Sequence, residues 1–355
     1  GQPGTNASVR IRGTSSISGS SQPLYVVDGI PIATGDFQTL NLNDFESITV
    51  LKDASAAALY GARGGTGVIV ITTKSGKAGQ TNFSYRTQTG FTQRPNPSQF
   101  EQMNSREMLD YEEFVGGFAP GLTAPGWVYS RKHPNYAGLP ATSPANNPFA
   151  ASKARYDFIR DSLGNNNVNY FDLLFRTGVS QTHELNMSGG NAATKYFLSI
   201  NYFQQDGTDR KSRIKRYTTR FNLDNTVGKL NIKFNTTVGY SIVDYNEGAF
   251  YAGNGTANPF AMAWRAKPYE NPFRQDGSLI FGTSSALVPR AIGNLIERSN
   301  NSQWIDKQVK TVTGLTLSYK LLPTVTLKNT TGLDASTNFG KGYIKAASYV
   351  GSLQS

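Results

Sequence analysis

The sequence predicts a small α/β domain followed by the long antiparallel strands of a transmembrane β-barrel. Several segments after residue 80 alternate apolar and polar residues over roughly 10 to 15 positions, about twice the usual strand length in globular proteins. The connections between these segments are alternately short and long. No apolar run approaches the roughly 18 residues that a membrane helix needs. Strands are therefore expected to cross the membrane.

The overall composition is compatible with this prediction. Hydrophobic residues make up 38% of the 355 residues, aromatic residues 12%, and the mean hydropathy is −0.40. A barrel strand averages out as polar because lipid-facing apolar residues alternate with lumen-facing polar ones. A large soluble β-sandwich would have a similar composition, so a soluble β-rich adhesin or binding module is the alternative.

The residues that could carry catalytic or metal chemistry are sparse. The chain has no cysteine and two histidines, His133 and His183, about fifty positions apart. Glu184 follows His183, but neighbouring strand residues point to opposite faces of a sheet, so the two cannot act as a pair. We therefore expect no enzyme, no metal site and no cofactor. The net charge of +11 is spread along the chain, apart from a cluster at residues 210–216 (RKSRIKR), and does not favour nucleic acid as a ligand.

The first region, up to about residue 77, contains short β-strands. Residues 9–12 and 48–51 are each predicted to form one. Residues 25–32 (YVVDGIPI) form two apolar arms around Asp28 and Gly29, a pair that favours a two-residue hairpin turn. Pro31 lacks an amide donor, which places its arm at the edge of a sheet.

A short helix and a glycine-rich return complete this region. Asp53, after Lys52, is predicted to cap a helix over residues 54–60 that ends at Tyr60, with Gly61 in the left-handed position after it. Residues 68–73 (VIVITT) then form a buried strand. The order helix, glycines, strand is the reverse of a phosphate-binding loop. Gly61, Gly64, Gly65 and Gly67 are thus assigned to a tight return, and Arg63 either contacts the barrel or is solvated.

The second region begins at residue 81. Phe83, Tyr85 and Phe91 share one face of the first long strand, and their neighbours are polar. The same alternation recurs in residues 196–202, 217–223, 230–242, 309–321 and 325–333, giving about seven strands with the segment after residue 176. Ten residues at ~3.3 Å each and a tilt of ~40° rise roughly 25 Å, the height of a bilayer's apolar band. We predict that the apolar faces point outward to lipid.

Two connections are too long to be turns, namely residues 94–176 and 246–306. Their place in the alternation of short and long connections predicts that both are extracellular. The first should contain a short amphipathic helix within residues 98–114. Both are rich in aromatic residues, which either form local clusters or anchor a partner. The candidates for partner contact are Trp127, Tyr129, Phe260, Trp264 and Tyr269.

Three segments of the first region resemble the plug of SusC/RagA-type TonB-dependent outer-membrane transporters. They are residues 9–13 (VRIRG), 23–31 (PLYVVDGIP) and 45–74 (FESITVLKDASAAALYGARGGTGVIVITTK). Residues 171–190 and 196–207 are similar to the early barrel strands of that family. The resemblance makes ten positions a structural motif of the plug: Asp28, Gly29, Lys52, Asp53, Tyr60, Gly61, Arg63, Gly64, Gly65 and Gly67.

The resemblance implies a 22-stranded barrel whose lumen is filled by the plug, with a TonB box before it and a SusD-like lipoprotein over the extracellular mouth. Residues 1–77 are then the later part of the plug, and residues 81–355 the first part of the barrel. The chain is expected to be a fragment. The resemblance also implies active import of a glycan or oligopeptide across the bacterial outer membrane, by a protein in contact with membrane lipid and lipopolysaccharide. A receptor that signals without transport is a further alternative.

Overall fold

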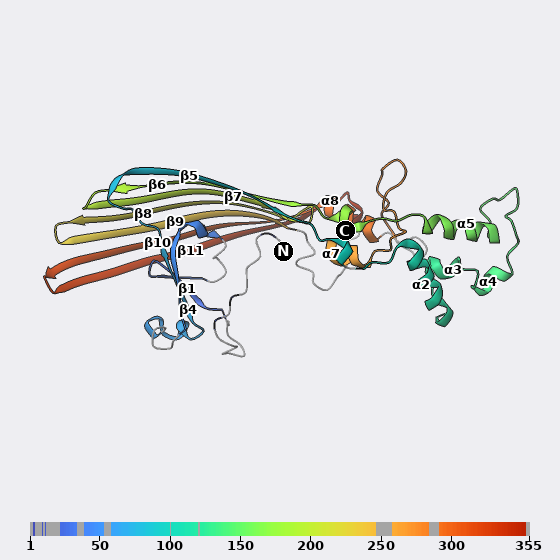
Figure 1. Cartoon of the computed structure of the whole chain (residues 1–355), viewed down its shortest axis with the longest axis horizontal. Helices are drawn as coiled ribbons and strands as arrows, with labels where there is room; N and C mark the ends of the chain where they lie inside the picture. The colour runs from blue at the N-terminus through green and yellow to red at the C-terminus, as the bar shows by residue number, and fades with distance from the viewer. Residues whose placement is uncertain are drawn as a thin grey trace.

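The computed structural model describes residues 3, 9, 11, 22–33, 39–52, 58–99, 101–119, 121–245, 258–283 and 291–352. They form two separate sheets and a set of helices (Figure 1). A long, seven-stranded sheet runs along the molecule. A small, four-stranded sheet lies against one of its faces, and the helices gather beyond one of its ends.

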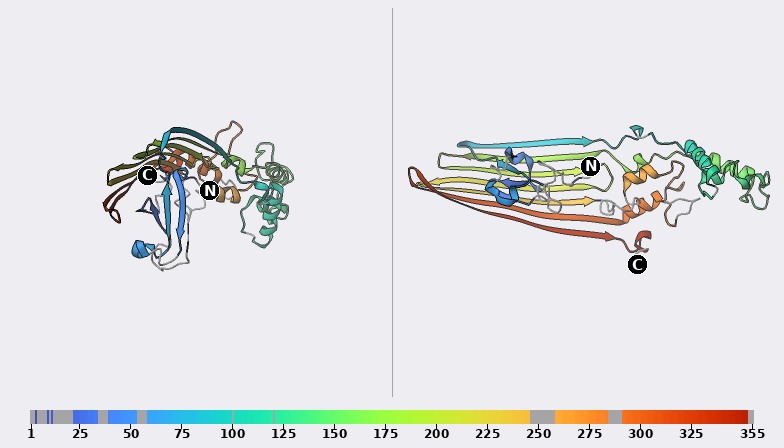
Figure 2. Two further views of the ribbon diagram at one scale, coloured as in Figure 1. Left: turned by 60° about the vertical axis from the view of Figure 1, so that its left-hand side comes forward. Right: turned by 90° about the horizontal axis from the view of Figure 1, so that it is seen from below.

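The long sheet is antiparallel throughout, with the order β11-β10-β9-β8-β7-β6-β5. Its strands are β5 (Gly79–Thr92), β6 (Gly178–Gly190), β7 (Thr194–Asp206), β8 (Arg213–Val227), β9 (Leu230–Tyr245), β10 (Ser302–Leu322) and β11 (Val325–Ile344). It curves like part of a cylinder wall around the small sheet (Figure 2). The predicted fold class, seven strands of a partial barrel with a small α/β domain on the inner side, is confirmed.

The predicted alternation of connection lengths is also confirmed. Tight turns join β6 to β7, β8 to β9 and β10 to β11, all at the end of the sheet on the left of Figure 1. At the opposite end the connections span residues 93–177, 207–212 and 246–301. The predicted second loop ended too late, because β10 begins at Ser302 and continues its pairing with β11 to that point.

The small sheet has the order β2-β1-β4-β3, from β1 (Leu24–Val27), β2 (Ile30–Ile32), β3 (Phe45–Leu51) and β4 (Val68–Thr73). Asp28 and Gly29 have φ angles of 49° and 88°, the positive values of a two-residue turn that matches strand twist. β2, which contains Pro31, is an edge strand as predicted. β4 lies between β1 and β3, parallel to β1.

Two predicted elements of this region differ in the structure. Val9 and Ile11 are not in a strand, and residues 10 and 12 lie outside the described residues, as do Asp53 and residues 54–57. From Ala58 the chain forms a 3-10 helix, η3 (Ala58–Gly64), that does not end at Tyr60. Gly61 kinks it, with φ of 60° and ψ of −149°, and this left-handed value agrees with the glycine preference.

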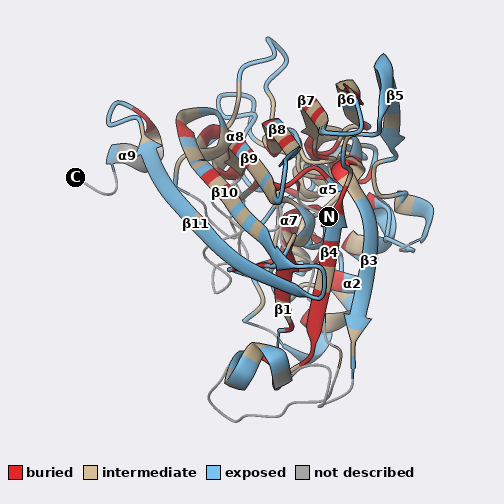
Figure 3. Ribbon diagram, turned by 90° about the vertical axis from the view of Figure 1, so that its left-hand side faces the viewer, coloured by how far each residue is buried: buried red, intermediate tan, exposed pale blue. Residues whose placement is uncertain are grey.

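The core of the first region lies in the small sheet and where it meets the long one. Figure 3 shows β1 and β4 as largely buried, whereas β11 is exposed. Tyr25, Val27, Ile30 and Ile71 form one buried cluster, to which β10 contributes Val312. Val26 and Val68 pack on the other side of the small sheet with Tyr60. Burial on both faces explains why β1 and β4 are apolar runs without alternation.

Apart from η2 (Leu42–Asp44) and η3, the helices lie in the long connections or, for α9, after β11. They are η4 (Pro97–Gln99), α2 (Ser105–Phe118), α3 (Pro125–Val128), α4 (Pro134–Ala137), α5 (Lys153–Gly164), α6 (Tyr170–Leu174), α7 (Pro259–Arg265), α8 (Ala291–Asn301) and α9 (Tyr349–Ser352). The helix predicted at residues 98–114 starts later, because the capping box of Asn104 and Glu107 fixes its beginning. None of the described helices is long and apolar enough to span a bilayer.

Candidate functional site

The two faces of the long sheet have opposite chemistry, and its pairing register fixes which face meets the small sheet. On β8, Thr218, Arg220 and Asn222 face the small sheet and contact it. Arg220 pairs with Thr237 of β9, so Leu230, Ile232 and Phe234 lie on the opposite face. The apolar faces therefore point away from the small sheet, as predicted, and the polar faces line the concave side.

The closest polar contact between the sheets is centred on Arg220, which is 3% exposed. Its Nη2 donates to Asp28 Oδ2 in the β1–β2 turn and to Thr73 Oγ1 at the end of β4. Its Nη1 donates to Thr237 Oγ1 at 2.7 Å. Asp28 also accepts from the amide and hydroxyl of Thr73, at 3.0 and 2.7 Å. The β1–β2 turn, β4 and the long sheet, hereafter the wall, are thus joined by the Asp28 carboxylate.

Further polar contacts extend this interface on both sides. Asn222 Nδ2 donates to the Lys74 carbonyl at 2.6 Å, and Asn41 Nδ2 reaches Glu184 Oε2 at 3.4 Å. Asp44 is buried against the same wall. Its desolvation raises the pKa of the carboxyl, while a hydrogen bond from Ser199 and the charge of Arg220 act in the opposite direction.

Apolar contacts accompany them, including that of Val312 with the small-sheet core. Ile30 of β2 packs over Gly314 and Gly332, which lie opposite each other on β10 and β11. A Cβ on Gly332 would lie 2.4 Å from Ile30 Cδ1, so the close approach requires glycine there. Nearby, Asp334 pairs with buried Lys310 and accepts from the amide of Ala33 at 3.0 Å. Among the described residues, the small sheet is thus seated by these polar groups and by the apolar contacts of Ile30 and of Val312 on β10.

The nine plug-motif residues that the structure describes lie in two places. Asp28 and Gly29 lie at the interface with the long sheet. Lys52 is exposed, Asp53 is outside the described residues, and Tyr60 packs on the Val26 cluster. Gly61, Arg63 and Gly65 are exposed and Gly64 and Gly67 are buried, all in or beside η3, on the side of the small sheet away from the wall (Figure 1).

The sequence analysis did not single out the wall residues at this interface. The alternation predicts only that Arg220, Asn222 and Lys310 lie on a polar face, and Glu184 was considered only as a neighbour of His183. A signal was present: a charge on the inward face of a wide barrel must either meet water or pair with the contents of the lumen. His183 and Glu184 do face opposite ways, as expected. Glu184 is buried against the small sheet, and His183 Nδ1 lies 2.8 Å from the Tyr85 hydroxyl on the outside.

The two long loops are joined at Glu112 of α2. Its Oε1 accepts from Lys267 Nζ at 2.6 Å and from the Tyr269 hydroxyl at 2.8 Å, both in the second loop. Its Oε2 accepts from the Gly126 amide at 2.8 Å. Next to this group, burial raises the pKa of Glu270 to about 7, opposed by Lys267 and reinforced by Glu112. Helices α2–α5 therefore form a lobe, residues 101–164, that is bound to the second loop.

This joint decides which loop aromatics are accessible. Trp127 and Tyr269 are 5% and 2% exposed, so they do not present a surface. Trp127 packs against Gly116 of its own loop, and Tyr269 donates to Glu112 across the two loops. Tyr129 is half-buried, with its ring 5.1 Å from that of Tyr156. Phe260 and Trp264 of α7 are 41% and 51% exposed. Of the five predicted contact residues, only the last two remain open to a partner.

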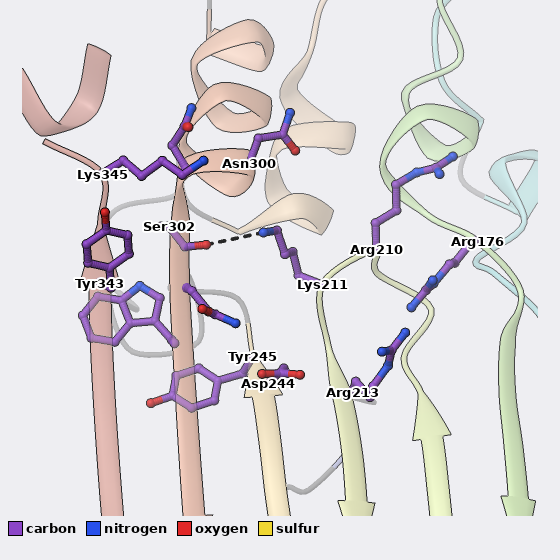
Figure 4. Close-up of a pocket in the computed structure, with 13 residues that line it drawn as sticks. Arg176, Arg210, Lys211, Arg213, Asp244, Tyr245, Asn300, Ser302, Tyr343 and Lys345 are labelled. Carbon is purple, nitrogen blue, oxygen red and sulfur yellow. Dashed lines mark hydrogen bonds between the residues drawn. The ribbon is translucent and has the colours of Figure 1, made fainter. Parts of the chain in front are cut away.

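A cavity of about 340 Å³ lies at the loop end of β8 to β11, below α8 (Figure 4). Its lining is strongly basic: Arg176, Arg210, Lys211, Arg213 and Lys345, with Asp244 as the acidic residue. Arg213 Nε donates to Asp206 Oδ1 at 2.5 Å, and Lys211 Nζ donates to the Ser302 carbonyl at 3.4 Å. Burial lowers the pKa of Lys211, with Asp244 opposing and Lys345 reinforcing the shift.

The described residues offer no arrangement for metal binding, since no three His, Asp or Glu side chains gather closely enough among them. The basic cavity instead suits an anion, and the polar interface between the sheets suits a reversible contact.

Comparison with known proteins identifies the first region. Residues 1–68 match the family model of the TonB-dependent Receptor Plug Domain. The chain is 30% identical over 280 residues to TonB-dependent receptor P26 of Formosa agariphila, covering 78% of this chain and 24% of that protein. It is also 30% identical over 271 residues to TonB-dependent receptor SusC of Bacteroides thetaiotaomicron, covering 74% of this chain and 22% of that protein.

Solved structures give the same result for the fold. The chain superimposes on the RagAB peptide transporter with a TM-score of 0.72 and 25% identity, over 96% of this chain and 38% of the transporter chain. The RagAB peptide importer in its open-open state gives a TM-score of 0.70 and 26% identity. The matched residues cover less than a quarter of the length of the two receptors above.

Proposed function

Since this chain belongs to the SusC/RagA-type TonB-dependent receptors, we propose that the whole protein actively imports a bulky nutrient across the bacterial outer membrane. Residues 1–77 act as part of a plug that gates the lumen, and residues 81–355 form the first strands and loops of the barrel. The observation that carries the proposal is the Asp28–Arg220 contact, which seats the small sheet on the polar, concave face of the wall.

The chemistry of this interface suits a gate. A barrel of about 22 strands would leak unless it were filled, so the plug has to close it at rest. Polar groups that leave each other can be re-solvated by water in the lumen, whereas a broad apolar interface would resist separation. A pull from TonB on a segment before the plug would then have to break these polar contacts and the apolar packing of Ile30 and Val312. No covalent step is required of the protein.

The partners follow from the same proposal. TonB supplies the pull, and a SusD-like lipoprotein covers the extracellular mouth, where the joined long loops lie. Outer-membrane lipid and lipopolysaccharide surround the apolar outer face. No nucleic acid is involved. The nutrient is a glycan or an oligopeptide. RagAB is a peptide importer, and that similarity at 25% identity favours peptides as the first class to test.

The test uses the full-length gene in its own host. A deletion strain is grown with oligopeptides or with oligosaccharides as the limiting nutrient, and uptake of fluorescent versions of each is measured. Restored growth and uptake on one class, lost again when TonB is deleted, is the expected result. Full complementation by the gene in a TonB deletion strain would contradict active import. Binding of a ligand with a change in gene expression and no uptake would favour the signalling receptor.

A further inference from the structure

The outward face of the seven long strands has an uneven charge distribution. Its register places six charged side chains on that face: Asp206, Arg213, Lys215, Asp244, Lys307 and Lys341. All six lie at the end with the long loops. The rest of the outward face of the described strands carries only apolar residues, Thr, Gln, Asn, Gly, Tyr and His183. The charge-free part is the section expected in the bilayer's apolar band.

A row of aromatic rings marks the upper boundary of this band. The rings of Tyr85, His183, Tyr202, Tyr217 and Tyr240 follow one another across β5 to β9, with centroids 5.1 to 6.3 Å apart. Aromatic residues prefer the level where apolar core meets headgroups. From Tyr217 to Val227 the strand rises roughly 25 Å, the full height of the band. Lys215 and Arg213 follow just above the row, so they lie at headgroup level.

The charge at this level is mainly positive. Lys307 and Lys341 are exposed, and no ion pair involves them among the described residues. Asp206 is already bound by Arg213, and Asp244 faces Arg213 across the β8–β9 pair. The basic cavity of Figure 4 adds Arg176, Lys211 and Lys345 directly above. Lys345 is close enough for its charge to contribute to lowering the pKa of Lys211.

Such an arrangement is unfavourable unless an anion neutralises it. Lysine stems can lie along the apolar band while their ammonium groups reach the headgroups. Guanidinium and ammonium groups bind phosphate through charge-assisted hydrogen bonds. An anion at this level, outside the barrel wall and at its extracellular end, belongs to the outer leaflet.

We propose that this basic collar (Arg213, Lys215, Lys307, Lys341) and the cavity above it bind the phosphate groups of an anionic glycolipid headgroup in the outer leaflet. The inference rests on the proposed outer-membrane location and names the site of that lipid contact. It is independent of which nutrient is imported.

The test measures the affinity of the detergent-purified full-length protein for diphosphoryl lipid A by native mass spectrometry. Each lysine near an anionic surface contributes about a factor of 5 in binding. We expect Lys211→Gln/Lys345→Gln and Lys307→Gln/Lys341→Gln each to weaken binding on the order of 25-fold. The control, Lys229→Gln/Lys328→Gln, removes the same charge at the opposite end of the strands and should leave the affinity within about twofold.

Three outcomes would overturn the site. These are unchanged affinity in both collar and cavity pairs, equal loss in the control pair, or equal binding of dephosphorylated lipid A. Displacement of lipid A by inorganic phosphate at equal concentration would reassign the site to a small soluble anion.

Nutrient uptake by the same variants is measured in parallel. Loss of nutrient uptake in the cavity pair with normal lipid binding would make the cavity a substrate site. Normal lipid binding without any nutrient uptake would leave this inference standing and refute import.

Discussion

Arg220 and Asp28 lie 192 positions apart in the sequence, yet the guanidinium of one donates to the carboxylate of the other across the boundary between the two sheets. Both groups are largely withdrawn from water, with side chains 3% and 13% exposed. Thr73 ties the same carboxylate to the end of β4. A force that moves the plug along the wall therefore has to break this pair.

The first prediction concerns the strength of that pair. Arg220→Gln leaves the Asp28 carboxylate without its cation, and removal of one partner from a buried pair costs about 3 kcal/mol or more. We expect the variant to open at a clearly lower urea concentration, read as the onset of ion conductance of the full-length protein in planar bilayers. Asp28→Asn/Arg220→Gln should recover part of the loss, because no buried charge remains.

A matched control lies on the same part of the wall. Thr236→Val removes an outward hydroxyl that shares a hydrogen bond of 2.8 Å with Thr313 and does not touch the plug. It should conduct at the same urea concentration as the parent. If Arg220→Gln behaved like this control, the pair would not hold the plug.

The second prediction tests the two faces of the wall with adjacent residues. Phe234 faces outward beside Phe221, with ring centroids 6.4 Å apart, and Asn235 faces inward beside a polar cavity that it lines. An arginine near the middle of the lipid face costs about 2 to 4 kcal/mol. Phe234→Arg should therefore reduce the heat-modifiable, folded fraction of the full-length protein strongly, and Asn235→Arg should reduce it little. If Asn235→Arg reduced the folded fraction more than Phe234→Arg, the face of Asn235 would be the lipid-facing one, contrary to this prediction.

The alternation of the long strands predicted this wall well. Phe83, Tyr217 and Phe234 face outward as expected. Side chains of a strand alternate between its two faces, and the face that carries the apolar residues is the one expected to meet lipid. The β1–β2 turn was equally predictable, since Asp28-Gly29 between apolar arms favours one turn type. Local signals of this kind do not depend on distant parts of the chain.

The candidate site was less predictable for a physical reason. Glu112 lies on an apparently solvated helix of the first loop, and its partners Lys267 and Tyr269 come about 155 residues later. The pattern of residues within either loop does not indicate this contact between the loops. For the same reason Tyr269 was a candidate for partner contact, whereas the joint between the loops buries it; Trp127 is buried within its own lobe, against Gly116.

The third prediction is a pH dependence of this joint. The pKa of Glu270 rises from 4.5 to about 7 in the folded loops, so the folded state binds more protons between these values. The joint is then most stable below about pH 4.5, and its stability falls, by up to about 3 kcal/mol, as the pH rises to 7. Hydrogen exchange of α2 and of residues 267–270, corrected for intrinsic rates, should be faster at pH 8 than at pH 5.5. Glu270→Gln should abolish the difference; its persistence would assign the effect to another group.

The last prediction concerns the lipoprotein partner, and it separates contact from stability. Phe260 and Trp264 lie on α7, which packs beside α6 and α8 at the end of the wall with the long loops, and both rings remain accessible. If the SusD-like lipoprotein docks there, Trp264→Ala removes an aromatic anchor, and such anchors contribute 2 kcal/mol or more at interface centres. We expect the amount of lipoprotein recovered with the detergent-purified full-length transporter to fall at least about tenfold, while its heat-modifiable mobility is unchanged. Trp127→Ala serves as the control, because it should affect the stability of the lobe and not the docking surface. It empties a buried site against Gly116 and should loosen the α2–α5 lobe, seen as faster hydrogen exchange. Its effect on lipoprotein recovery should be smaller than that of Trp264→Ala, because the Trp127 side chain is buried. Unchanged recovery with Trp264→Ala, in cells that express the lipoprotein, would remove α7 from the docking surface.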